Sequence, residues 1–416
     1  MQTATVATVR AAQRRAAPWP YDQLDVAALR AAGRAPVPFQ EFVLKIHQRC
    51  NLACDYCYVY EHADQSWRER PRSMSRAVWQ AALARIAAHV RRHGLGQVRV
   101  VLHGGEPLLF GVDALAELAG AVRAAMPASC RVELAMQTNG VLLDERAVAV
   151  LVEHGIRAGV SVDGTAADHD RHRRQPGGRG SFRAVERALT LLRRPQNQPA
   201  YAGVLCTVVP ETDPIAAYEQ LLSFAPPAID LLLPHANWDN PPRPLAGRPT
   251  PYADWLVAVF DRWYSDAPPA RVRLFDDAIS LVLGGAGRGE QLGLSPCGVL
   301  VIESDGAIEQ VDALKSAYQG AASTGLTVLS DELDDALDDP GVVARQLGRD
   351  ALADQCRLRC PAVGICGGGH YAHRYRRGAG FRQPSVYCRD LHALVRHVHT
   401  VVSADLARLG AHRQPS

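Results

Sequence analysis

The sequence predicts an α/β fold in which a partial (β/α)6 barrel is followed by a smaller, cysteine-rich domain. Short apolar runs alternate six times with helical patterns after residue 39. The glycine-rich stretch Gly284–Gly287 ends this pattern, and seven of the ten cysteines gather in two groups on either side of it. The predicted units are an N-terminal extension (residues 1–38), the barrel with flanking helices (39–285) and the cysteine-rich domain with a C-terminal helix (286–416).

Composition narrows the class of protein. The 416 residues are 47% hydrophobic and 21% charged, and 46 basic against 43 acidic residues give a net charge of +3. This balance argues against binding of nucleic acid or membrane through charge. No apolar run approaches the length of a membrane span, and the N-terminus lacks the apolar core of a secretory signal, so a cytoplasmic location is expected. Cysteines stay reduced there, which favours metal or cluster ligation over disulfides.

Six β/α units account for the barrel. β-branched apolar runs predict its strands at Phe42–Ile46, Val98–Leu102, Arg131–Met136, Ala158–Val162, Gly203–Val209 and Ile229–Leu233. Segments with helical periodicity predict its helices at Arg76–Arg92, Val112–Ala125, Asp144–His154, Ser181–Arg193 and Pro214–Phe224. Alternation of this kind indicates a parallel sheet. A full eight-unit barrel needs about 250 residues, so six units fit this stretch better.

The remaining elements follow in order. A short helix is expected near Asp25–Ala32 in the extension. Helices are predicted at Tyr252–Tyr264 and Asp276–Leu283 after a proline-rich loop. Val299–Glu303 and Ile308–Val311, on either side of Asp305-Gly306, predict a β-hairpin. A final helix is expected from Asp390 to about Leu409.

The first cysteine group follows the first strand directly, as Cys50-x3-Cys54-x2-Cys57. It is expected on the first loop at the carboxyl ends of the strands, where barrels of this kind place their active sites. A structural zinc site takes four protein ligands, whereas a [4Fe–4S] cluster held by three cysteines keeps one iron open. Zinc with a remote fourth ligand, or unligated thiols, are the alternatives.

This loop resembles the signature of the radical SAM enzymes. In that family the cluster binds S-adenosylmethionine and cleaves it reductively to a 5′-deoxyadenosyl radical. Tyr56 stands where the family places an aromatic side chain that covers the cluster. Gly104, Gly105 and Glu106, in His103-Gly-Gly-Glu-Pro107, match the family's GGEP motif.

The resemblance extends to other predicted strand ends and implies cofactor contacts there. The glycines would let the backbone approach the cofactor, and Glu106 would accept the ammonium of its methionine. Asn139 ends the third strand and Ser161 the fourth, where relatives contact ribose and methionine. Arg173 matches an arginine that reaches toward the cofactor carboxylate. The alternative for each motif is a purely structural role, as a strand-to-helix turn that requires glycine or a helix cap.

The second cysteine group resembles the SPASM extension of radical SAM peptide maturases, with departures. That extension usually holds two auxiliary [4Fe–4S] clusters. Its common C-x2-C is C-x3-C here, His370 stands where a cysteine is usual, and Val311 takes another cysteine position. The resemblance therefore implies one auxiliary cluster, for electron transfer or structure, on Cys356, Cys360, Cys366 and Cys388. Structural zinc on these four thiols is the alternative. A degenerate second cluster on Cys297 and His370 is left open.

Five further sequence segments narrow the resemblance to the FxsB-type radical SAM/SPASM maturases. They are Leu44–Cys50, Tyr58–His62, Ile302–Gly306, Gly369–Tyr375 and Pro384–Cys388, and the resemblance spans about residues 39–406. It implies an oxidoreductase that joins an aromatic ring to a side-chain β-carbon of a ribosomally made precursor peptide, forming a cyclophane. The partners would be that peptide and an electron donor such as a flavodoxin or ferredoxin. The alternatives are a formylglycine-generating sulfatase maturase and a non-enzymatic, zinc-stapled peptide-binding scaffold.

Asp312 is the predicted catalytic base. Joining a β-carbon radical to a ring requires the ring to lose one electron and one proton afterwards. Asp312 follows Val311 at the end of the predicted hairpin. In relatives an aspartate beside this cysteine position acts as the base. A helix cap or a solvated turn is the alternative role for a lone aspartate.

Overall fold

The computed structural model describes residues 23–265 and 270–411. The first 22 residues of the predicted N-terminal extension therefore lie outside the described residues. The rest of the extension contains helix α2 (Val26–Ala31), which the Asp25 side chain caps by accepting a hydrogen bond from the amide of Ala28. Arg30 fixes this helix to the C-terminal part of the chain, because its guanidinium pairs with Asp338 at 2.9 Å.

A single ten-stranded sheet organises the fold, in the order β10-β9-β8-β1-β2-β3-β4-β5-β6-β7. Strands β1 to β7 are parallel to their neighbours, as predicted from the alternating pattern. Their bounds are β1 Glu41–His47, β2 Gln97–Gly104, β3 Arg131–Thr138, β4 Ile156–Ser161, β5 Tyr201–Thr207, β6 Ala228–Leu232 and β7 Arg271–Val272. The predicted partial barrel is confirmed, and the carboxyl ends of its strands meet on one side.

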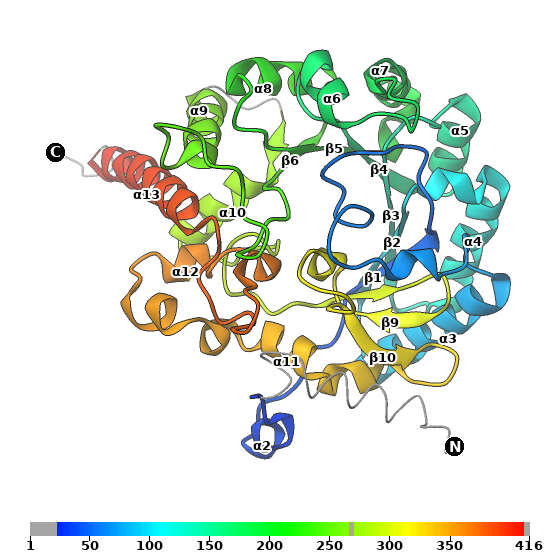
Figure 1. The fold of residues 1–416 in the computed structure, drawn as a ribbon. Helices are drawn as coiled ribbons and strands as arrows, with labels where there is room; N and C mark the ends of the chain where they lie inside the picture. Colours follow the sequence, from blue (N-terminus) through cyan, green and yellow to red (C-terminus); the bar gives the residue numbers. More distant parts are fainter. Residues whose placement is uncertain (1–22, 266–269, 412–416) are drawn as a thin grey trace.

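Helices surround the barrel strands, as Figure 1 shows looking toward the strand ends. They are α3 Arg76–His93, α4 Val112–Ala125, α5 Glu145–Glu153, α6 Ala166–His172, α7 Phe182–Leu192, α8 Pro214–Ser223, α9 Pro251–Ser265 and α10 Arg273–Val282. Helix α6, a seven-residue helix that begins after the Thr165 cap, was not predicted from the sequence. It is short and its residues are mostly polar, so it carries no apolar periodicity.

Local sequence explains the limits of α3, the longest barrel helix. The hydroxyl of Ser75 accepts a hydrogen bond from the amide of Val78 and so caps the first turn. Gly94 ends the helix with a φ of 59°, in the left-handed region that glycine adopts without strain. Between them Ala82 and Ile86, one turn apart, are completely buried against the sheet.

The C-terminal part prolongs the same sheet. Strands β8 (Val299–Ile302) and β9 (Ala307–Glu309) form the predicted antiparallel hairpin, and β10 (Ser323–Thr327) continues it. Strand β8 also pairs in parallel with β1, with Leu44 opposite Ile302. This pairing brings the hairpin to the strand end where β1 enters the cysteine loop. The division of domains at residue 285 stays a prediction.

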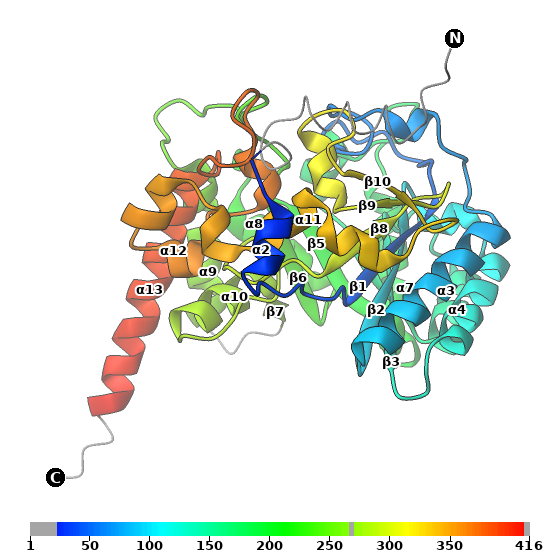
Figure 2. The same ribbon diagram turned by 90° about the horizontal axis from the view of Figure 1, so that it is seen from below.

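Shorter elements complete the C-terminal part before a long last helix. They include α11 (Pro340–Gln346), α12 (Val363–Cys366) and the 3-10 helices η4 (Asp312–Ser316) and η8 (Tyr371–Arg374). Helix α13 (Cys388–Ala411) packs along α9 and α10 at one end of the molecule (Figure 2). The carboxylate of Asp390 accepts hydrogen bonds from the first amides of α9, at Tyr252 and Ala253. Among the described residues, no helix is both long and apolar enough to cross a membrane.

Candidate active site

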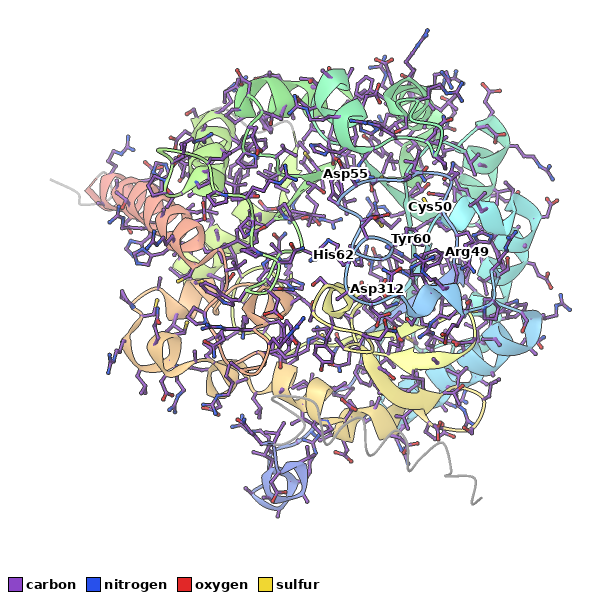
Figure 3. All side chains as sticks on the ribbon, viewed as in Figure 1. Arg49, Cys50, Asp55, Tyr60, His62 and Asp312 are labelled. Atoms are coloured by element: carbon purple, nitrogen blue, oxygen red, sulfur yellow. The ribbon has the colours of Figure 1, made fainter. Side chains whose placement is uncertain are left out.

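The loop after β1 holds Cys50, Cys54 and Cys57 together. The amide of Cys57 donates to the carbonyl of Cys54 across 3.1 Å, which closes a tight turn between these two cysteines. The amide of Leu52 donates to the sulfur of Cys50 at 3.4 Å, and the Asn139 side-chain amide lies 3.5 Å from the same sulfur. All three thiols are free. Figure 3 shows this loop, with Cys50, Asp55 and His62, over the centre of the ring of helices.

The three thiols open into a cavity of about 250 Å³ at the carboxyl ends of the strands. Predicted site residues from four different strand ends and loops meet there. Those that line it are Cys50, Cys54, Tyr56, Cys57, Gly104, Gly105, Asn139, Ser161 and Arg173. Residues more than 120 positions apart in the sequence thus share one surface, because parallel strands bring their ends together.

Glu106 has a different position from the one expected. Its side chain is completely buried and does not line the cavity. Its carboxylate accepts hydrogen bonds from the hydroxyl of Thr138 (2.7 Å) and the amides of Asn139 (2.8 Å) and Leu108 (3.1 Å). Glu106 therefore ties the end of β2 to the end of β3. Burial raises its pKa to about 7.

The glycines of this motif are required by the chain's own backbone. A Cβ at Gly104 would collide with the carbonyl of His47, and one at Gly105 would collide with that of Arg49. The amide of Gly105 donates to the carbonyl of His47 at 2.7 Å. The expected reason, close approach to a cofactor, is thus incomplete: these glycines let the ends of β1 and β2 lie against each other.

Arg173 and Tyr56 form one wall of the cavity through a shared carboxylate. The Nε of Arg173 donates to Asp163 Oδ2 at 2.8 Å, the Tyr56 hydroxyl donates to the same oxygen, and the guanidinium lies 5.5 Å from the centre of the Tyr56 ring. Asp163 also accepts a hydrogen bond from the amide of Thr207 at 3.0 Å. Tyr56 is therefore held beside the thiols with its ring covered by a cation.

The thiols of the loop suit a bound metal cluster. Burial raises the pKa of Cys50 to about 12 and that of Cys54 to about 11, with Arg173 opposing the shift at Cys54. Thiolates this far from solvent need a cation to become stable. An iron–sulfur cluster supplies that charge, and three thiols on one short loop are the donor set that leaves one of its irons open.

Asp312 lies behind the cavity wall in a buried ionic group. Its Oδ2 is 2.6 Å from the Nζ of Lys45 at the end of β1, and its Oδ1 is 3.2 Å from the Nζ of Lys315. Burial alone would raise the pKa of Asp312, but Lys315 and Lys45 hold it below its usual range. The negative charge of Asp312 acts to raise the pKa of Tyr58 and of His103, both of which line the cavity. Figure 3 shows Asp312 beside the cysteine loop.

The four cysteines of the second group also come together. Cys356, Cys360, Cys366 and Cys388 line a small pocket with apolar neighbours such as Val363. Burial raises the pKa of Cys366 to about 11. Four thiols facing one enclosed space fit a closed cluster site.

Cys297 stands apart from this quartet. Its sulfur is 2.8 Å from Glu290 Oε1 and 2.7 Å from the guanidinium of Arg345, and these two charged side chains also pair with each other. His370 lies on the other oxygen of Glu290, at 3.5 Å. Cys297 and His370 thus contact the two carboxylate oxygens of one residue, Glu290.

Several cavity residues were not predicted. His103 precedes the glycine motif, Gln137 ends β3, and His235 follows β6; Tyr58 and Tyr60 come from the cysteine loop itself. Burial and the nearby Lys45 lower the pKa of His103 to about 4, so this ring is neutral at neutral pH. The strand-end position of His103, Gln137 and His235 was the available signal, since every barrel strand ends at this face.

The fold and the cysteine loop define a radical SAM enzyme. The model of the radical SAM superfamily matches residues 44–221, which run from β1 to α8. The matched segment is the barrel with its cysteine loop, and the cofactors of that superfamily are a [4Fe–4S] cluster and S-adenosylmethionine.

Several relatives of the chain are named as anaerobic sulfatase-maturating enzymes. The chain is 27% identical over 274 residues to the cysteine-type anaerobic sulfatase-maturating enzyme of Clostridium novyi, covering 63% of this chain and 70% of that enzyme. It is 32% identical over 186 residues to the serine-type enzyme of Klebsiella aerogenes, covering 42% and 43%.

Two solved structures share the fold over most of the chain. One is native anSMEcpe with bound AdoMet and Kp18Cys peptide, with a TM-score of 0.76, 20% identity and coverage of 89% of this chain and 100% of that one. The other is Streptococcus suis SuiB bound to the precursor peptide SuiA, with a TM-score of 0.56, 15% identity and coverage of 94% and 82%.

Proposed function

We propose that this protein is a radical SAM maturase that crosslinks a ribosomally made precursor peptide, joining an aromatic ring to a side-chain β-carbon. The cavity at the barrel mouth carries the proposal. It combines three thiols on one loop, polar strand ends and a carboxylate, Asp312, just behind its wall. The peptide substrate is supported by relatives named as sulfatase-maturating enzymes and by related folds solved with peptides bound.

The cavity residues divide into a cluster set and a cofactor set. Cys50, Cys54 and Cys57 would hold the [4Fe–4S] cluster. Tyr56, Gly104, Gly105, Asn139, Ser161 and Arg173 would contact S-adenosylmethionine. When bound, these two groups supply a 5′-deoxyadenosyl radical that removes a hydrogen atom from a β-carbon. Glu106 would act from behind, by holding Asn139 and the end of β2 in place.

The new bond leaves the aromatic ring with one hydrogen too many. The ring regains aromaticity when it loses one electron and one proton. Cys356, Cys360, Cys366 and Cys388 would hold an auxiliary [4Fe–4S] cluster that accepts electrons, which a flavodoxin or ferredoxin could in turn exchange. Asp312 would take the proton. Two lysines keep it ionised, and a weak base suffices because a ring in this state is strongly acidic.

Formylglycine formation is the second candidate, because the matched curated relatives named above are sulfatase-maturating enzymes. That reaction also begins at a β-carbon and ends in oxidation, so it would use the same cavity.

Co-expression with the precursor encoded by a short neighbouring reading frame distinguishes the two reactions. A crosslinked product loses two hydrogen atoms per crosslink, is not fragmented between the joined residues in tandem mass spectrometry, and does not react with a hydrazide. Serine oxidised to formylglycine loses two hydrogens as well, but its aldehyde forms a hydrazone. A hydrazide-reactive product would replace the crosslinking proposal by the formylglycine one.

A further inference from the structure

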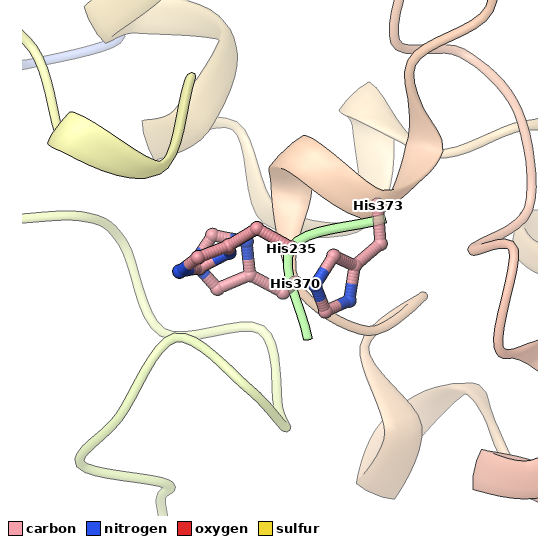
Figure 4. A group of neighbouring side chains, drawn as sticks. All are labelled: His235, His370 and His373. Atoms are coloured by element: carbon pink, nitrogen blue, oxygen red, sulfur yellow. The ribbon is translucent and has the colours of Figure 1, made fainter. Parts of the chain in front are cut away.

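Three histidines from two distant parts of the chain meet beside the barrel mouth. His235 follows β6, while His370 precedes η8 and His373 lies within it. One ring nitrogen from each lies within 4.8 Å of the corresponding nitrogens of the other two. The ring centres of His370 and His373 are 5.0 Å apart, and that of His235 is 5.5 Å from His370. Figure 4 shows the three side chains as neighbours, with His235 on the segment after β6 and the other two at η8.

Three ring nitrogens in this group are buried and have no hydrogen-bond partner. The side chain of His373 is 3% exposed, and neither of its ring nitrogens has a hydrogen-bond partner. The Nδ1 of His235 is buried without a partner as well. A neutral imidazole carries one donor and one acceptor, and burying them unpaired is unfavourable. These nitrogens therefore point to a ligand that accepts lone pairs.

The third histidine is oriented by a carboxylate. The Nε2 of His370 lies 3.5 Å from Glu290 Oε2, and its Nδ1 accepts a hydrogen bond of 3.3 Å from the amide of Ala372. Both contacts are longer than an ordinary hydrogen bond, so either nitrogen can be released. A carboxylate that takes the remaining N–H is the usual support for a metal-bound histidine.

Two of the three rings, those of His235 and His373, have a lowered pKa. Burial and the neighbouring His370 lower the pKa of His235 to about 3, and burial lowers that of His373 well below its usual range. Neutral imidazole is the form that donates a lone pair to a metal.

Other clusters of potential ligands among the described residues are already satisfied. Glu303, Glu309 and Asp312 face the ammonium of Lys315. In the group of His89, His93 and Asp334, both ring nitrogens of His89 have partners, the carboxylate of Asp334 and the carbonyl of Phe39. The three-histidine group is the one whose nitrogens lack such partners.

We propose that His235, His370 and His373 bind one divalent transition-metal ion, with Zn²⁺ as the expected occupant. Three neutral histidines are a common zinc ligand set and leave a fourth position open for water or substrate. His235 also lines the active-site cavity, so the ion would lie at the edge of the space proposed for the peptide. The site is independent of the reaction proposed above.

Zinc binding to the full-length, anaerobically reconstituted protein tests this site. After equilibration with zinc chloride and gel filtration, the wild type should retain about one zinc per chain. His373→Phe, which fills the same space without ring nitrogens, should lower zinc affinity ~100-fold or more. His373→Ala and His235→Ala should behave alike. His399→Ala, on an exposed part of α13, is the matched control and should keep wild-type affinity.

Iron content separates this site from the cysteine clusters. All the histidine variants should keep the iron content of the wild type, which also shows that they fold. The double variant Cys356→Ala/Cys366→Ala should still bind the zinc ion, because the three histidines are unchanged in it. Zinc held by the four thiols would instead be lost from this variant. Equal zinc affinity in wild type and His373→Phe, or no zinc retained by iron-loaded wild type, would overturn the proposal.

Discussion

The two cysteine groups of this chain contain the same side chain in opposite settings. Cys50, Cys54 and Cys57 lie on a loop that follows a parallel strand, and they face a cavity of about 250 Å³ whose mainly apolar walls also carry polar side chains from the strand ends. The second group, Cys356 to Cys388, faces an enclosed pocket with apolar neighbours. The first setting gives a bound cluster room for a ligand, while the pocket between the four thiols of the second has a volume of only about 20 Å³.

The supporting elements explain the difference. Parallel strands end together and leave space between their ends, so a loop at that face opens onto a shared cavity. The second group is held by a short helix, α12, and by the first residue of α13, which packs against α9. Ligand number follows from this architecture: three thiols where chemistry needs an open iron, four where none is needed.

The largest effect is expected at the open site. Cys54→Ala removes one of three thiolates and should reduce 5′-deoxyadenosine formation, with dithionite and S-adenosylmethionine, to background. Chromatography of the reaction mixture measures it. Cys130→Ala, which removes a buried thiol just before β3, is the matched control and should react like the wild type. Normal cofactor cleavage by Cys54→Ala would remove the cluster from this loop.

A change at the closed site should separate cofactor cleavage from product formation. Cys356→Ala/Cys366→Ala should lower iron from about eight to about four per chain if each site holds a four-iron cluster. 5′-Deoxyadenosine should remain detectable, while modified peptide should be lost. One zinc and four irons per chain in the wild type, with that zinc absent from the double variant, would contradict the second cluster.

Asp312 lies beside the open site, and its substitution should have an intermediate effect. Asp312→Asn keeps the shape but removes the base, so modified peptide should fall about 10²-fold or more, with both clusters and cofactor cleavage retained. Mass spectrometry of the peptide measures the loss. Product within threefold of the wild-type rate would exclude Asp312, and His103 would be the next candidate.

A control for Asp312 comes from the same ionic group. Burial raises the pKa of Glu309 to about 7, so Glu309→Gln imitates a carboxyl that is already partly protonated. It removes a partner of Lys315, 3.1 Å away, without touching Asp312. Glu309→Gln should have a thermal stability close to that of Asp312→Asn. Its yield of modified peptide should be clearly higher than that of Asp312→Asn.

The smallest effect is expected at the isolated thiol. Cys297→Ala should leave iron per chain unchanged, because Glu290 and Arg345 surround this sulfur. Cys360→Ala, measured in parallel, should lose about four irons. An equal loss from Cys297→Ala would mean that the protein assembles a further cluster there.

Local patterns in the sequence predicted the barrel and both cysteine groups. Strand and helix periodicity need only neighbouring residues, and a cysteine loop directly after Phe42–Ile46 had to lie at the strand ends. Nine of the predicted residues line the cavity for this reason. Glu106 was misplaced because sequence shows that it follows a strand, but not which way its side chain points.

Long-range pairings were beyond the sequence. The parallel contact of β8 with β1 joins segments more than 250 residues apart, and it alone brings Asp312 to Lys45. Lys45 and Lys315 are the only lysines of an arginine-rich chain, and both contact Asp312. A compact ammonium fits a buried carboxylate where a planar guanidinium needs more room. The rarity of lysine was a signal that these two residues have a special role, but composition does not show which residue they contact.

The open and closed sites can be told apart directly by electron paramagnetic resonance of the dithionite-reduced protein. Adding S-adenosylmethionine should change the signal of one cluster and leave that of the other unaltered. The responsive signal should be absent from Cys54→Ala and present in Cys356→Ala/Cys366→Ala. A cofactor-responsive signal that survives in Cys54→Ala and disappears from the double variant would contradict the assignment of the two sites.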